Sequence, residues 1–230
     1  MNVKMIRMLA LMMVSGVSMT AHASPLLVSP DDHDRYQAGT YCMRESDVVR
    51  NMLSSLPKGT AHKQFVLDAL CIKERIKPYL SATDTTIRYH AYRANAWVIY
   101  ALHEDNENSL NGERDRAIEQ TIYLLSLLDN AHLQVPDETT DKAKALLSET
   151  AIVSQNEQHP DFLDYRPDLW QKIATIKKHP RFDDVAHLIA ESEIKLFWAS
   201  QEYRTRGWRH ANEHVKAVER YLDRADTVTK

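Results

Sequence analysis

The pattern of apolar and polar positions predicts a helical hairpin in the middle of the chain. Over residues 84–108 and 113–128, apolar side chains recur every three or four positions, the spacing of one helical face. A polar run separates the two stretches and ends in Asn111-Gly112, residues that tolerate the left-handed backbone angles of a reversal. We therefore expect two antiparallel helices. Their inward positions are predicted to be Ile87, Ala91, Ala94, Trp97, Val98, Ala101, Ala117, Ile118, Thr121, Ile122, Leu124, Leu125 and Leu128.

The same periodicity predicts helices on both sides of this hairpin. Before it, we expect helices over 45–56 and from Thr60 to Leu80. After it, we expect one from about Asp137, with buried Ala143, Ala145, Leu146, Leu147, Ala151 and Ile152, and others over 168–178, 183–204 and 208–224. Tyr203 belongs to the predicted inward face of the helix over 183–204, and Gly207 to the turn that follows it. The sequence thus predicts an all-α fold of antiparallel helical hairpins, packed as an irregular bundle or short α-solenoid-like array of about seven to eight helices.

The first 23 residues have the pattern of a cleavable secretory signal peptide. Lys4 and Arg7 precede an apolar run of about a dozen residues, and Ala21-His22-Ala23 supplies the small residues of a cleavage site. The run is shorter than the ~20 residues that a spanning helix needs, so we expect no membrane span in the mature chain. The predicted location is the periplasm of a Gram-negative-type cell, unless a further signal exports the protein.

Three segments follow from this division of the chain. Residues 1–23 are the predicted signal peptide, and residues 24–43, rich in proline and polar residues, are a predicted extended leader. Residues 44–230 are predicted to form one all-α domain, and the polar stretch 154–167 is where a sub-boundary would fall. Hydrophobic residues at 43% and only five glycines agree with a folded helical protein.

Charge and cysteine content restrict the function further. Loss of Lys4 and Arg7 with the signal peptide takes the formal charge from −3 to −5, which gives no overall attraction to nucleic acid. Cys42 and Cys71 are the only cysteines, and in an oxidising compartment we expect them to form a disulfide. A bonded sulfur cannot act as a nucleophile, and a free, reactive Cys42 is the alternative.

The sequence His210-Ala211-Asn212-Glu213-His214 matches the H-x-x-E-H pattern of some zinc enzymes. In that pattern two histidines bind zinc and the glutamate acts as general base. On a helical wheel centred on Ala211, His214 lies at the edge of the buried stripe, His210 on its flank and Glu213 near solvent. A third ligand would have to come from upstream. Two histidines on a helix flank are more often solvated or packed, and this is the interpretation that we favour; zinc is the alternative cofactor.

Two further groups are candidates for binding. Glu104 and Glu202 occupy similar places in the two predicted hairpins and are candidate paired carboxylates, although glutamates beside a helix seam are more often solvated. Arg204, Arg206, Trp208 and Arg209 form a candidate contact cluster for a carboxylate-bearing partner. In the alternative interpretation, the arginines complement the preceding helix dipole and Trp208 packs on the turn.

Similar arrangements of aromatic, alanine and glutamate residues occur in both hairpins. One is Tyr92-Arg93-Ala94-Asn95-Ala96-Trp97 running into His103-Glu104, and the other is Trp198-Ala199-x-x-Glu202-Tyr203 running into Gly207-Trp208-Arg209-His210-Ala211. They resemble helical modules found ahead of OmpA-like domains in Gram-negative envelope proteins, over roughly residues 85–225. The resemblance implies a fold and a compartment but transfers no site. No OmpA-like domain follows here, and its peptidoglycan-binding aspartate and arginine have no counterparts.

These observations favour a protein that acts by contact. The chain has no glycine-rich phosphate loop, no Gly-x-Ser-x-Gly elbow and no Cys-x-x-Cys motif, which argues against common enzyme classes. We predict a non-catalytic periplasmic scaffold or interaction module that needs no cofactor and meets another envelope protein or a peptidoglycan-associated partner. The alternatives are a zinc-dependent hydrolase that uses His210, His214 and Glu213, and an immunity-type binder of a periplasmic toxin or enzyme.

Overall fold

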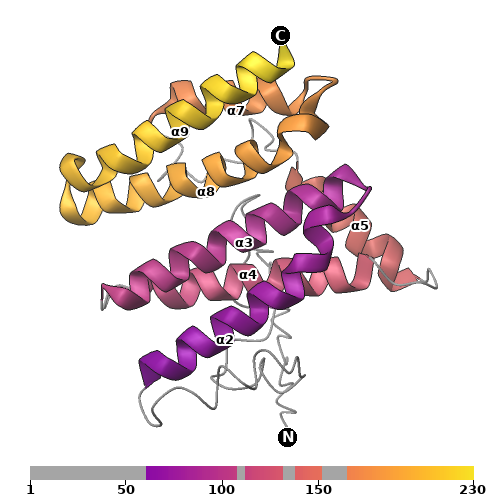
Figure 1. Ribbon diagram of the computed structural model, residues 1–230, viewed down its shortest axis with the longest axis horizontal. Coiled ribbons are helices and arrows are strands. Elements are labelled where there is room, and N and C mark those ends of the chain that lie inside the picture. The colour runs from indigo at the N-terminus through magenta and orange to yellow at the C-terminus, as the bar shows by residue number, and fades with distance from the viewer. Residues whose placement is uncertain (1–60, 108–111, 132–137, 152–164) are drawn as a thin grey trace, which may run out of the picture.

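The computed structural model describes residues 61–107, 112–131, 138–151 and 165–230, and every regular element in these ranges is helical (Figure 1). The predicted all-α class is therefore confirmed for this part of the chain. No helix within these ranges is both long and apolar enough to cross a membrane. The elements are α2 (Ala61–Ile76), the 3-10 helix η2 (Lys77–Ser81), α3 (Thr85–Asn106), α4 (Glu113–Ala131), α5 (Glu138–Ala151), α7 (Pro167–Lys177), α8 (Phe182–Arg206) and α9 (Trp208–Thr229).

Several sequence predictions fall outside these ranges. The signal peptide, the leader, the helix over 45–56 and most of the stretch 154–167 lie outside the described residues. Cys42 does as well, whereas Cys71 is buried on α2. The disulfide between them stays a prediction.

The central hairpin consists of α3 and α4, as the apolar periodicity predicted. Asp84 begins α3 as its N-cap, and its side chain accepts hydrogen bonds from the backbone N–H groups of Thr86 and Ile87. Gly112 precedes α4 with a φ of 77°, a conformation that favours glycine. All of the inward positions predicted for the two helices are buried. The chain reverses where a polar run and a glycine permit it, and the two apolar stripes then face each other.

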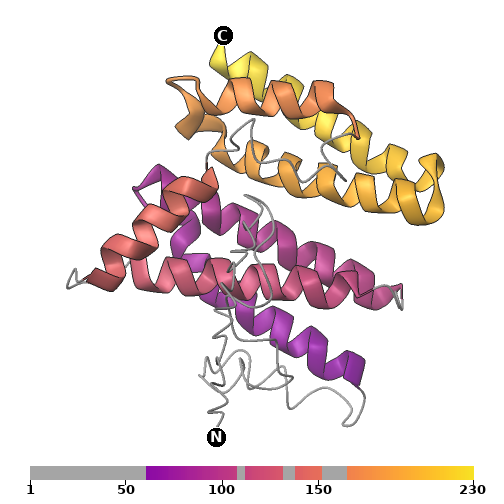
Figure 2. The ribbon, with the colours of Figure 1, turned by 180° about the vertical axis from the view of Figure 1, so that it is seen from behind.

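A second hairpin, formed by α8 and α9, lies against the first (Figures 1 and 2). Helix α8 packs along α3, and the two helices meet through aromatic rings. The ring centroids of Trp97 and Phe197 lie 5.1 Å apart, and those of Tyr100 and Trp198 lie 4.8 Å apart. Helix α9 covers α8 with a narrow apolar stripe of Ala211, Val215, Val218, Leu222 and Ala225.

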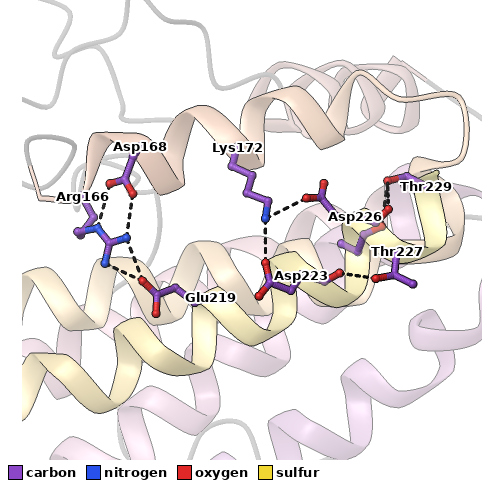
Figure 3. A network of polar contacts seen from close by, with 9 residues as sticks. Arg166, Asp168, Lys172, Glu219, Asp223, Asp226, Thr227 and Thr229 are labelled. Atoms are coloured by element: carbon purple, nitrogen blue, oxygen red, sulfur yellow. Dashed lines mark hydrogen bonds and ion pairs between the residues drawn. The ribbon is translucent and has the colours of Figure 1, made fainter.

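Helix α7 packs on the second hairpin, alongside α9, and is joined to α9 by ion pairs (Figure 3). Arg166, in the left-handed region with a φ of 54°, contacts Asp168 at 2.8 Å and Glu219 at 3.0 Å. Lys172 lies 3.1 Å from Asp223 and 3.0 Å from Asp226. These groups are partly exposed, so each pair adds little stability; together they fix the register of α7 on α9.

A different kind of ion pair lies in the core, between α3, α7 and α8. The carboxylate of Glu193 is fully buried, with Lys177 Nζ 2.8 Å from one oxygen and Arg93 Nε 3.6 Å from the other. The hydroxyl of Tyr89 donates a hydrogen bond to the same carboxylate. Burial lowers the pKa of Lys177, and the neighbouring carboxylate opposes that shift. Glu193 is thus a shared counter-ion of two buried cations.

His90 connects this group to α5. Its Nε2 lies 2.8 Å from the carbonyl oxygen of Leu147, so Nε2 must donate the hydrogen bond. Its Nδ1 can then accept from Arg93 Nη1 at 3.3 Å. Burial, followed by the charges of Arg93 and Lys177, holds the pKa of His90 well below its usual value. His90 therefore acts as a neutral bridge between α3 and α5.

Two predicted core positions are wrong. Ala145 is exposed because α5 buries only the side that carries Ala143 and Leu147. A residue two positions from each of these points to the opposite side of the helix. Tyr203 is 51% exposed in the last turn of α8, where its ring packs against Tyr165 at the surface, with centroids 5.0 Å apart. Periodicity identifies the buried side of a helix but does not show how far the neighbouring helices cover it.

We predict that Glu193→Ala lowers the free energy of unfolding by about 3–5 kcal/mol, since it removes the carboxylate that pairs with buried Lys177 and also contacts Arg93. Glu219→Ala removes a carboxylate from the exposed pair on α9 and should cost less than about 1 kcal/mol. Urea denaturation of both variants measures the difference. Equal losses would contradict the expectation that the buried variant leaves an uncompensated charge.

Candidate functional site

The ends of the two hairpins meet on one side of the molecule and form a charged cavity that is open to solvent. The last turns of α3 and α8 lie next to the first turns of α9 (Figure 1), and the cavity between them has a volume of about 280 Å³. Every side chain that lines it is histidine, glutamate or arginine. They are His103, Glu107, Glu202, Arg206, Arg209, His210, Glu213 and His214.

Helical spacing brings these residues together. His103 and Glu107 lie one turn apart at the end of α3, and Glu202 and Arg206 have the same spacing at the end of α8. Gly207 follows α8 directly with a φ of 88°, so α9 can begin at the next residue. Its N–H donates to the carbonyl oxygens of Glu202 and Tyr203, which closes the end of α8.

Arg206 joins the two hairpins across the cavity. Its Nη1 donates to Glu107, the C-cap residue of α3, and lies 3.8 Å from Glu202 Oε1 on its own helix. His103 Nε2 lies 3.0 Å from the other oxygen of Glu107. The hydrogen bond from Arg206 is the main cause that lowers the pKa of Glu107. An ion-paired carboxylate therefore stands at the mouth of the cavity.

Glu202 is the most buried of the lining residues, at 5% exposure. Its Oε1 accepts a hydrogen bond from Trp198 Nε1 at 3.4 Å, which orients the carboxylate. Its Oε2 is buried and has no hydrogen-bond partner within the described part of the chain. A buried carboxylate oxygen without a donor is unfavourable, and such atoms mark places where a ligand or an ion would compensate.

His214 packs against Trp198 behind the cavity. The two rings stack with centroids 4.0 Å apart and an interplanar angle of 28°, and the ring of His103 meets the same indole edge-on at 4.4 Å. Burial lowers the pKa of His214 to about 4, with smaller effects from Lys195 and His103. Its imidazole is therefore neutral at neutral pH.

The histidine and glutamate residues of the H-x-x-E-H segment all line this cavity. His210 and Glu213 are exposed and His214 is half-buried, as the helical wheel predicted. Their upstream neighbours are on α3 and α8. Within the described residues, the group of three potential ligands whose atoms all lie within 4.8 Å of one another is instead His103, Glu107 and Glu202.

Sequence analysis missed His103 and Glu107 as site residues. Both belong to the polar run that was interpreted only as the end of the first helix. The available signal was their four-residue spacing, which puts an imidazole and a carboxylate on one helical face. Their contact with α8 could not be seen, because Glu107 and Arg206 are 99 positions apart.

Glu104 and Glu202 are buried, at 3% and 5% exposure, so the expectation that they are solvated is wrong. Both lie near Tyr100. Burial raises the pKa of that hydroxyl, and the charges of Glu113, Glu104 and Glu202 raise it further. The two glutamates are buried because α3 and α8 pack side by side as far as their last turns. The starts of α4 and α9 then cover these turns. The pairing of Glu104 with Glu202 stays a prediction.

The candidate contact cluster divides into two parts. Arg206 turns toward the cavity, where it pairs with Glu107, and Arg209 also lines the cavity. Trp208 is 63% exposed and therefore does not pack on the turn. The guanidinium of Arg209 lies 5.6 Å from the centre of the Trp208 ring. Arg204 is exposed nearby.

No protein-family model, no curated protein and no solved structure matches this chain. The resemblance to modules of OmpA-associated proteins therefore stays a prediction.

We predict that His214 makes folding sensitive to mild acid. Its pKa is about 4 in the folded protein against an ordinary 6.5, so the unfolded chain binds the proton more tightly. The stability that depends on neutral His214 is fully present above about pH 6.5 and is lost as the pH falls toward 4. His214→Gln should reduce the decrease in melting temperature between pH 7 and pH 5. His210→Gln, an exposed histidine one turn away, is the control, and an equal effect of both would contradict the assignment.

Proposed function

We propose that this chain is an exported envelope protein that works by contact with a partner and not by catalysis, through the surface where α8 turns into α9. The contact surface is defined here as Tyr203, Arg204, Trp208 and Arg209. The observation that carries the proposal is Trp208, whose indole is 63% exposed directly beside a guanidinium. Tryptophan and arginine are among the residues most enriched at the energetically important positions of protein interfaces.

The residue types of this surface support binding. Tryptophan, tyrosine and arginine dominate the energetically important positions of protein interfaces, because they combine large area with specific polar contacts. Tyr203 is 51% exposed, next to the ring of Tyr165. Neither Arg204 nor Arg209 has a salt bridge to any described residue. Their charges are available to an approaching partner.

The chemistry of the surface suggests the kind of partner. Guanidinium groups bind carboxylates in a bidentate manner, and an adjacent indole adds apolar area. The whole chain has a formal charge of −3, so this positive area is local and favours a particular acidic site over general attraction. An acidic segment of another envelope protein fits these properties, as does a carboxylate of a peptidoglycan-associated partner.

The envelope location rests on the sequence. Residues 1–23 have the three parts of a secretory signal peptide, and the resemblance to modules ahead of OmpA-like domains implies the same compartment. An immunity-type protein that neutralises a periplasmic toxin or enzyme would use the same kind of surface. The two roles differ in the partner that is captured.

We predict that a photo-crosslinking amino acid at position 208 captures a discrete partner in intact cells. The same amino acid at position 228, a 36% exposed valine near the end of α9, is the matched control and should capture none. Charge reversal by Arg204→Glu with Arg209→Glu should reduce the product at position 208 at least tenfold, because two carboxylate contacts are lost. Mass spectrometry of the product identifies the partner.

Products of equal yield at positions 208 and 228 would contradict a specific contact surface, as would a product that is insensitive to charge reversal. A captured structural envelope protein would indicate a scaffold. A captured secreted effector would indicate an immunity-type binder.

A further inference from the structure

We propose that the cavity between the hairpin ends is a site for a divalent transition-metal ion of the zinc type, held by His103, Glu107 and Glu202. The site lies beside the contact surface but does not depend on it, and its ligands differ from the histidine pair that the sequence singles out. Three observations support it: the spacing of the ligand atoms, an unsatisfied buried oxygen, and the position of an arginine.

The ligand atoms are already close together. One imidazole nitrogen and two carboxylate oxygens from these three residues lie within 4.8 Å of one another. In a tetrahedral zinc site with bonds of about 2.0–2.1 Å, neighbouring ligand atoms are separated by roughly 3.3–3.5 Å. His103 and Glu107 share one face of α3, and Glu202 comes from α8, so small rotations of the side chains close the remaining distance. Nitrogen and carboxylate ligands together suit zinc.

The second observation is independent of this spacing. Glu202 is 5% exposed, lines the cavity, and has one oxygen without a hydrogen-bond donor in the described part of the structure. The other oxygen accepts from Trp198 Nε1, which holds the carboxylate in one orientation. In metal sites a hydrogen bond of this kind commonly orients a carboxylate ligand. A cation in the cavity would satisfy this oxygen, which no donor among the described residues reaches.

The third observation is that Arg206 already places a positive charge between the two carboxylates. Its Nη1 contacts Glu107 and lies 3.8 Å from Glu202. Its side chain is 32% exposed at the end of α8, so it can turn outward into solvent. A metal ion and this guanidinium therefore compete for the same two carboxylates, and binding of one displaces the other.

The cavity also offers groups for the remaining coordination positions. His210, Glu213 and His214 lie on its α9 side. The ring of His214 is 6.4 Å from that of His103, centre to centre. A fourth ligand can come from this helix or from water, because zinc sites with three protein ligands commonly keep one position for water.

The competition gives an unusual test. Full-length protein without a histidine tag is treated with chelator and titrated with Zn²⁺ by calorimetry, and with Co²⁺ by visible absorption. We expect one ion per chain, with affinity reduced at least tenfold by His103→Ala and by Glu107→Gln. Arg206→Ala should raise the affinity on the order of tenfold, because it removes a cation a few ångströms from the ion. Glu202→Gln should also weaken binding, but this residue is buried and the variant could fail to fold. Glu107 is at the surface, so Glu107→Gln tests the site without that complication.

Glu219→Gln on α9 and His179→Ala, both away from the cavity, are the matched controls and should leave the affinity unchanged. Absence of one-to-one binding would overturn the proposal. Weaker binding in Arg206→Ala would overturn it too, because the arginine would then be supporting the site and not competing for it. Loss of binding only in His210→Ala and His214→Ala would assign the ion to the H-x-x-E-H pair and reject the site proposed here.

Discussion

The packing of α3 against α8 is the interaction on which the rest of this structure depends. Each helix is the first arm of a hairpin, and their contact joins the two hairpins into one body. The contact has an apolar part, the rings of Trp97, Tyr100, Phe197 and Trp198, and a charged part around Glu193. The aromatic rings provide the area that stabilises the interface. Buried ion pairs add little net stability, but separating one is costly, so a shift that moved Glu193 away from Lys177 would be unfavourable.

The same packing produces the site at the helix ends. Because α3 and α8 stay together as far as their last turns, side chains from both hairpins converge where the chain reverses. Glu202 is then covered, and one of its oxygens has no donor among the described residues, whereas Glu107, at the C-cap of α3, remains partly open to solvent. The contact surface around Trp208 lies just beyond, on the first residues of α9. The cavity and the exposed aromatic surface are therefore two sides of one turn.

Much of the fold could be predicted from the sequence because the periodicity of a helix is visible within a short stretch of residues. The stripes of α3, α4 and α9 follow the three-and-four spacing closely, and glycines mark the turns at 112 and 207. What could not be predicted was the coverage of each stripe. Tyr203 follows the spacing of α8 but extends beyond the helices that could bury it, whereas Glu104 and Glu202 break hydrophobic expectations and are enclosed. The cavity could be predicted only in part for the same reason. The H-x-x-E-H motif identified its α9 side, but His103 and Glu107 become part of it only through packing against a hairpin about a hundred residues away.

Gly207 has a consequence for how this protein can vary. Apart from its two chain neighbours, no atom of the described residues lies within 4 Å of where a Cβ would stand, so the position has space but not a backbone conformation that other residues adopt readily. The length of this junction is as restricted as its identity. Each added residue would rotate α9 by about 100° relative to α8. Its alanine and valine stripe would then leave α8, and the side chains facing α3 would be replaced by others. An insertion at Gly207 should therefore be poorly tolerated, because a single added residue changes which face of α9 meets α8.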